Sequence, residues 1–205
     1  MKIILSPAKK MKYDDSGIDV MGLPVFIKDA ERIRDWLKSR TYDELKKLWS
    51  CSDKVAKQNV QRLSDMDLKS RLSPAILSYD GIAYQYMAPA VFEDRMLSYI
   101  QEHLRIQSGF YGVLKPLDGV VEYRLEMQAK AQLSGSKSLY DFWGGRLYEQ
   151  VSDGSGIIIN LASKEYSKCI EKYLKPHDKF ITCTFAEEEK GKLMQKGVYC
   201  KMARG

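Results

Sequence analysis

HLRIQSGFYGVLKPLDGVVEYRLEM, residues 103–127, mixes glycine, proline, aromatic and charged residues without a single helix or strand period. Segments that only pack against a core rarely have this composition. Gly109 and Gly112 bracket two aromatic residues, so the backbone after a helix ending near Leu104 is predicted to turn through positive φ. Such a turn leaves amide N–H groups free to point at an anion, and phosphate is the anion that suits it.

Length and charge limit the classes of protein to which this chain can belong. At 205 residues with 44% apolar content, the chain can close one sizeable hydrophobic core, which we interpret as a single domain. The 33 Lys and Arg residues outnumber the 27 acidic residues and give a formal net charge of +6, with an isoelectric point near 9.0. This balance favours polyanionic partners, although a solvated basic surface without a partner would give the same numbers.

The N-terminus and the cysteines indicate the compartment. Residues 1–10, MKIILSPAKK, hold too short an apolar run for a signal peptide, and no other run approaches a membrane span. The cysteines lie far apart without a C-x-x-C pair and are expected to be reduced thiols. His103 and His177 have no partner at metal-ligand spacing. We therefore expect a cytoplasmic protein with no metal site and no contact with a membrane.

Hydrophobic periodicity predicts strands and helices in alternation. Apolar runs at 2–5 and 157–159, and alternation of apolar and charged residues over 123–127, indicate strands. Helices are expected to begin near residues 27, 41, 52, 74, 92, 138 and 163. The fourth of these helices is expected to end at Gly81.

Two local signals complete this framework. Thr41 and Glu44 are spaced as a capping box at the start of a helix. Residues 179–186 and 192–202, on either side of Gly191, are predicted to form a C-terminal β-hairpin. Together the elements predict an α/β fold, a single compact domain with a mixed β-sheet surrounded by helices.

Several sequence blocks resemble one protein family. In addition to residues 103–127, they are SPAK at 6–9, SDKVAKQNVQR at 52–62, LYDFWGG at 139–145, INLASKEY at 159–166 and KMARG at 201–205. In this order and spacing the chain resembles the YaaA family of bacterial peroxide-stress-resistance proteins. The resemblance implies a compact α/β fold with a helix-hairpin-helix-like element, and a role in limiting damage from intracellular iron. Relatives usually continue past the final ARG, so the single domain 1–205 is expected to lack the family's C-terminal extension.

A helix-hairpin-helix element holds DNA by its backbone. Amides of a glycine-bracketed hairpin and the N-terminus of the next helix grip one phosphate without reading bases. Here Pro116 and Gly119 would shorten the second helix, so the resemblance provides most of the support. A tight structural turn, with Arg124 paired to Glu126, is the alternative interpretation. The predicted DNA- and phosphate-binding residues are Lys9, Lys54, Arg62, Arg105, Ser108, Gly109, Tyr111, Gly112, Lys115 and Arg124.

The SPAK block has two further interpretations. Ser6 and Lys9 match the S-x-x-K spacing of serine acyl-enzymes, but no K-T-G motif follows, so acyl transfer is disfavoured. A basic cleft at the end of the first strand is the better interpretation, with Glu126 as a candidate general base. The predicted small-ligand cleft comprises Ser6, Lys9, Asn59, Glu126, Asn160 and Ser163.

Three functions remain open at this point. The leading hypothesis is a cytosolic, cofactor-free stress protein that binds DNA, double-stranded or branched, without sequence specificity and without enzymatic activity. The alternative is an enzyme that acts on a nucleotide or a related small anion in the SPAK cleft. The third is a protein-interaction module. Cations that converge in an enclosed cavity would favour the enzyme, and the same cations on a convex or grooved face would favour DNA.

Overall fold

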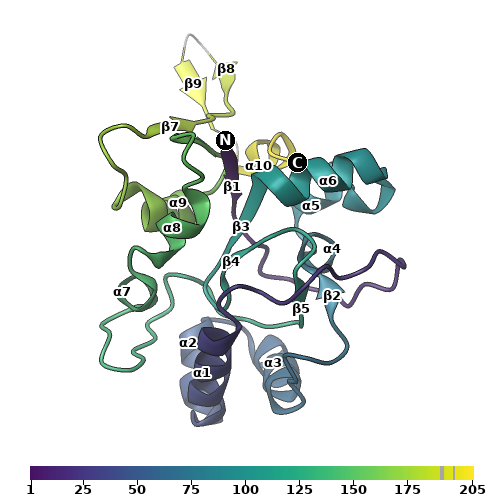
Figure 1. The fold of residues 1–205 in the computed structure, drawn as a ribbon. Coiled ribbons are helices and arrows are strands. Elements are labelled where there is room, and N and C mark those ends of the chain that lie inside the picture. Colours follow the sequence, from purple (N-terminus) through teal and green to yellow (C-terminus); the bar gives the residue numbers. More distant parts are fainter. Residues whose placement is uncertain (190–191, 196) are drawn as a thin grey trace.

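A five-stranded mixed sheet, in the order β4-β3-β1-β6-β7, forms the centre of the protein (Figure 1). The computed structural model describes residues 1–189, 192–195 and 197–205. The strands of this sheet are β1 (Lys2–Leu5), β3 (Leu104–Ser108), β4 (Gly112–Leu114), β6 (Ile157–Asn160) and β7 (Lys179–Thr182). Two short two-stranded sheets accompany it: β2 (Ser73–Pro74) with β5 (Gly119–Val120), and β8 (Glu187–Glu189) with β9 (Lys192–Met194).

β1 is the central strand. It pairs in parallel with β3 on one side, where Ile3 is opposite Leu104, and with β6 on the other, where Ile3 is opposite Ile159. β7 extends the parallel part beyond β6, whereas β4 closes the other edge antiparallel to β3. The apolar sequences of β1 and β6 suit strands that are covered on both faces.

Helices surround the sheet in three groups (Figure 1). The first group lies at one end of the molecule and consists of α1 (Ile27–Lys38), α2 (Tyr42–Trp49) and α3 (Asp53–Ser64). The second comprises α4 (Ala75–Ser78), α5 (Ile82–Met87), the 3-10 helix η1 (Pro89–Val91), α6 (Asp94–His103) and α10 (Gly197–Met202). The third comprises α7 (Leu139–Trp143), α8 (Arg146–Val151) and α9 (Lys164–Glu171).

The local signals of the sequence are largely confirmed. The Thr41 hydroxyl accepts a hydrogen bond from the Glu44 amide at 3.3 Å, and the Glu44 carboxylate accepts one from the Thr41 amide at 2.7 Å. This capping box satisfies two donors at the start of α2. In α1, Ala30, Ile33 and Leu37 form the buried stripe that their spacing predicts. The mixed sheet and the C-terminal hairpin are also present.

Residues 103–127 differ from their prediction. The predicted helix ends at His103, and Leu104 starts β3, which is buried along its whole length. The polar residues Arg105 and Gln107 hide this strand in the sequence, because a strand covered on both faces shows no alternation. Residues 123–127 keep their alternating burial but form no strand, and β5 precedes them.

The predicted boundaries of two other elements were wrong. The helix predicted from Pro74 to Gly81 is the single turn α4, and α5 begins only after Gly81. In the terminal hairpin, residues 179–182 instead form β7, a strand of the main sheet, and 197–202 form α10. The hairpin itself is β8 with β9, and the turn predicted at Gly191 lies outside the described residues.

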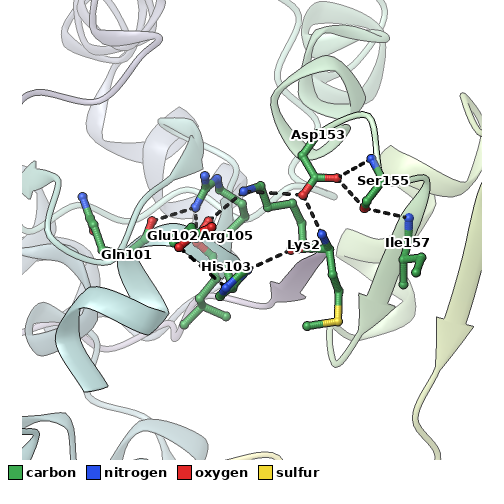
Figure 2. Close-up of polar contacts among 10 residues, drawn as sticks. Lys2, Gln101, Glu102, His103, Arg105, Asp153, Ser155 and Ile157 are labelled. Atoms are coloured by element: carbon green, nitrogen blue, oxygen red, sulfur yellow. Dashed lines mark hydrogen bonds and ion pairs between the residues drawn. The ribbon is translucent and has the colours of Figure 1, made fainter. Parts of the chain in front are cut away.

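The N-terminus is fixed to the loop that precedes β6 (Figure 2). The amine of Met1 donates to Asp153 Oδ2 at 2.7 Å, and Lys2 Nζ lies 3.7 Å from the same oxygen. The other carboxylate oxygen of Asp153 accepts from the amide and hydroxyl of Ser155. Burial alone would raise the pKa of Asp153, but the hydrogen bonds from the N-terminal amine and Ser155 outweigh it and hold this pKa well below its usual range.

Asp153→Asn is therefore expected to lower the free energy of unfolding by about 1 kcal/mol at pH 7. A carboxyl group with a depressed pKa in the folded state stabilises above its unfolded pKa, and this contribution is lost as the pH falls through the folded pKa. The difference between wild type and variant should thus narrow between about pH 4 and pH 2 in urea unfolding. Asp35→Asn, at an exposed pair with Arg34, is the control and should change little. A stability difference between wild type and Asp153→Asn that does not vary with pH would contradict the depressed pKa assigned to Asp153.

Candidate functional site

A cleft of about 480 Å³ lies at the carboxyl ends of β1 and β6. Ser6 follows β1 and Ser163 follows β6, and both line the cleft. The chain continues from β1 to β3 on one side and later returns to β6 on the other, so β1 is a topological switch point. In open α/β sheets ligands bind in the crevice outside such strand ends. The volume is in the range of small-ligand sites.

Several chain segments close this cleft. The SPAK loop forms one wall, residues 123–126 a second, and α10 contributes Lys201 near its end. The wall from α5 approaches the loop closely, since a Cβ built on Gly81 would lie 2.7 Å from the Cβ of Ala8. Glycine is therefore required for this contact.

Cations outnumber carboxylates around the cleft. Among the described residues, the charged side chains that line it are Lys9, Lys10, Arg124, Lys201 and Arg204 against Asp80, Glu126 and Glu165. Lys10 is paired with Asp80 at 2.5 Å on one wall. Glu126 bridges two other cations, with Lys9 Nζ at 2.9 Å from one carboxylate oxygen and Arg124 Nη2 at 3.3 Å from the other. The net positive charge suits an anionic ligand.

Two of these cations have unused donors. The Nε atoms of Arg124 and Arg204 are buried and have no hydrogen-bond partner among the described residues. Leaving a buried donor unpaired costs about 1–3 kcal/mol, and more when the group is charged. An oxyanion that accepts from both a guanidinium Nε and an Nη removes this cost, because carboxylate and phosphate match the guanidinium fork.

Aromatic side chains form the apolar part of the cleft. Tyr84, Tyr123 and Tyr166 line it, and all three are largely buried. The Tyr84 hydroxyl donates to the Ser6 carbonyl at 2.8 Å, which fixes the SPAK loop. Burial raises the pKa of Tyr123 to about 12, so this hydroxyl stays protonated at neutral pH. These rings give the cleft walls on which a flat apolar group can pack.

Glu165 differs from the other carboxylates of the cleft. It is half-buried, and its carboxylate accepts a hydrogen bond from the Gln128 amide at 3.2 Å. Burial, together with the negative charge of Glu126, raises its pKa. The raised pKa means that this carboxyl group keeps its proton up to a higher pH than an exposed glutamate does.

Ser6 serves the fold. Its hydroxyl oxygen accepts a hydrogen bond from the Ser163 amide at 2.8 Å, at the N-terminus of α9, and lies 3.2 Å from the Ser163 hydroxyl. Lys9, which an S-x-x-K enzyme would direct at its serine, is paired with Glu126. Ser6 thus satisfies the backbone N–H of Ser163, the N-cap residue of α9, whose own side chain makes no capping hydrogen bond.

The turn at 108–112 does not present free donors. Ser108 Oγ accepts from the amides of Phe110 at 3.1 Å and Tyr111 at 2.8 Å, and every residue from Ser108 to Gly112 is buried. The expectation that these amides point outward was therefore wrong. The hydroxyl of Ser108 satisfies them inside the core, and Tyr111 is fully buried and cannot stack on a base.

Other predicted residues are dispersed. Arg105 is buried in β3 and donates to the carbonyls of Leu104 and Gln101, and burial lowers its pKa. Lys54 and Lys115 are exposed and do not line the cleft. Of the predicted phosphate-binding set, the cleft therefore gathers Lys9 and Arg124.

Arg62 and the two predicted asparagines also lie outside the cleft lining. Arg62 pairs with Glu122 in a separate, smaller depression of about 300 Å³. Asn59 donates to the Val55 carbonyl within α3 at 2.8 Å. Asn160 accepts from the Ala162 amide at 2.9 Å and donates to the Thr182 hydroxyl at 3.2 Å, so it links the ends of β6 and β7.

The predicted site residues do not include Glu165, Tyr166, Lys201 and Arg204, which line the cleft. A signal for them was available. Glu165 and Tyr166 belong to the INLASKEY block, and Lys201 and Arg204 belong to KMARG. Blocks that are distant in sequence meet at one cleft, which is typical of a functional site assembled by the fold.

The fold and site define an α/β protein with a cation-lined cleft at a topological switch point. The protein family described as peroxide stress protein YaaA matches residues 1–205. The chain is 58% identical over 205 residues to a UPF0246 protein of Agathobacter rectalis, and covers 82% of that relative's length. It is 54% identical to a UPF0246 protein of Lachnoclostridium phytofermentans and 50% identical to one of Ligilactobacillus salivarius, with all of the chain matched and 80% and 83% of the relatives covered. The chain belongs to the YaaA family of peroxide stress proteins.

Two features are absent from the described residues. No helix among them has the combined length and apolar character of a membrane span. Within the same residues, no group of three or more His, Cys, Asp or Glu side chains is arranged to hold a metal ion.

Proposed function

We propose that this YaaA-family protein acts in the cytoplasm during peroxide stress by binding a nucleotide unit of DNA in the cleft between β1 and β6. The observation that carries the proposal is that Arg124 and Arg204 line one cleft, and that the Nε atom of each has no hydrogen-bond partner among the described residues. A phosphate oxygen pair fits such donors, and the tyrosine walls suit a base or a sugar. The formal net charge of +6 favours a polyanion as the source of this nucleotide.

The route to peroxide protection is part of the same proposal. The family description supports peroxide stress, and binding of DNA would place the protein where iron-dependent damage matters. Contacts to phosphate carry no sequence information, so binding is expected without base specificity. Because the 108–112 turn is buried, the cleft replaces it as the proposed phosphate site.

The test compares the binding of a free mononucleotide with the binding of nucleotides that are part of DNA. Wild type is titrated with adenosine monophosphate, a single-stranded oligonucleotide and a duplex, at about 50 and 200 mM salt. Lys9→Met should weaken oligonucleotide binding by about fivefold and reduce the salt slope by about one. Lys115→Met is the matched control, because Lys115 is an exposed lysine outside the cleft, and it should bind as wild type does.

Each result has a defined meaning. Oligonucleotide binding at least ten times tighter than that of the mononucleotide supports DNA as the source. Equal affinity supports a free nucleotide in the same site. No binding of any probe rejects the proposed function, and a larger effect of Lys115→Met than of Lys9→Met rejects the cleft as its location.

A nucleotide-processing enzyme is the second candidate. The observation that favours it is the pair of carboxylates in an anion-binding cleft, since Glu165 has a raised pKa and Glu126 is held by Lys9. Two neighbouring carboxyl groups, one of which has a raised pKa, form the type of pair that enzymes use as general acid and general base. Incubation of nucleotides with wild type and with Glu165→Gln, followed by product analysis, tests it, and turnover that is equal in both would reject this role.

A further inference from the structure

The carboxylate of Glu126 already forms ion pairs with two cations that an anionic ligand would need to bind. It joins Lys9 Nζ at 2.9 Å and Arg124 Nη2 at 3.3 Å, and its side chain is only 17% exposed. A single carboxylate that bridges a lysine and an arginine has the charge and approximate shape of part of a phosphate group. In this structure the Glu126 carboxylate is therefore the anion that Lys9 and Arg124 bind.

This arrangement leaves Arg124 incompletely bonded. The guanidinium side chain is 14% exposed, and it uses one Nη on Glu126 at the long distance of 3.3 Å while its buried Nε has no partner among the described residues. A bidentate acceptor would engage Nε and Nη together. Glu126 lies only two residues along the same segment and does not make this bidentate contact. Arg124 therefore interacts more weakly with Glu126 than it could with a bidentate oxyanion.

We propose that Glu126 is an exchangeable internal counter-ion of the cleft, which the phosphate of the ligand displaces from Arg124 and Lys9. This inference rests on the proposed function. It assigns Glu126 to selectivity: a ligand must compete with a tethered carboxylate, so weak monoanions fail and a dianionic phosphate succeeds. Removing the charge of Glu126 while keeping its shape should therefore strengthen phosphate binding, the opposite of what removal of a direct ligand-binding group would do.

The experiment measures binding of inorganic phosphate and of adenosine monophosphate to wild type, Glu126→Gln and Glu122→Gln by calorimetry. Glu126→Gln is expected to bind both probes at least tenfold tighter. Glu122→Gln is the matched control, because Glu122 lies on the same segment, pairs with an arginine, Arg62, and is similarly buried, yet lies outside the cleft. It should change affinity less than twofold. Thermal unfolding of both variants shows whether each is folded.

The outcomes separate this inference from the proposed function. If wild type binds the probes and Glu126→Gln binds them no tighter, the counter-ion role is rejected and the proposed function stands. If both glutamine variants tighten binding equally, a general charge effect explains the result and the role of Glu126 is again rejected. If none of the proteins binds, the proposed function fails with it. Binding by Glu126→Gln that is at least tenfold tighter than binding by wild type, with Glu122→Gln little changed, supports the exchange.

Discussion

Gly109→Ala is expected to lower the free energy of unfolding by at least about 3 kcal/mol. A Cβ built on Gly109 would lie 2.6 Å from the carbonyl oxygen of Leu125 and 2.9 Å from the carbonyl carbon of Glu126. Both are backbone atoms, so no side-chain rotation relieves the contact. The turn is buried, and its amides depend on Ser108, so the backbone cannot shift outward without losing those hydrogen bonds.

Urea unfolding of the purified variant measures this loss. Gly22→Ala is the matched control, because a Cβ at Gly22 meets nothing within 4 Å, and its stability should stay within about 0.5 kcal/mol of wild type. The segment that Gly109 touches also carries Arg124, which is proposed to bind the phosphate, so a folded Gly109→Ala protein should also bind nucleotide more weakly. Equal stability of the two variants would show that the close packing of the turn against residues 125–126 is not maintained in solution.

Arg124→Lys is expected to weaken mononucleotide binding by about 30-fold, which corresponds to roughly 2 kcal/mol. The substitution keeps the positive charge and removes the planar fork, so it tests the geometry of the site rather than its net charge. Lysine provides one ammonium where arginine provides Nε and Nη to one oxyanion. Long-range attraction should be nearly unchanged, and the salt slope with it.

Fluorescence or calorimetric titration measures this effect. Arg34→Lys, on the surface of α1 where Arg34 pairs with the exposed Asp35, is the control and should bind as wild type does. If Arg124→Lys keeps the wild-type affinity, the ligand recognises only charge. The unsatisfied Nε of Arg124 would then have no part in binding.

The sequence predicted elements whose causes are local. The capping box of Thr41 and Glu44 and the buried stripe of α1 depend on residues within a few positions, and both are present. β3 was missed because its partners are distant: Leu104 pairs with Ile3 about 100 positions away, and polar Arg105 conceals the strand. The hydroxyl of Ser108 accepts a hydrogen bond from an amide of its own turn. The sequence does not predict this contact, because it depends on the direction of the side chain in three dimensions.

The same distinction applies to the candidate site. Ser6, Lys9 and Ser163 were placed at strand ends by sequence pattern, and these three residues line the cleft. Lys201 and Arg204 reach it only because α10 packs against α5, a contact between distant segments. Asn59 and Asn160 were reasonable polar candidates, but nearby backbone groups take up their amides, which composition cannot reveal.

The position of β1 has a consequence for synthesis on the ribosome. The first strand to emerge needs β3, made about 100 residues later, and β6, made about 155 residues later, before either of its edges is paired. Until then an apolar segment with two open edges is exposed in the nascent polypeptide, where it can pair with other chains. Completion of the sheet must therefore await synthesis of β7 at Lys179–Thr182, and chaperone engagement during elongation is expected to raise the yield of native protein.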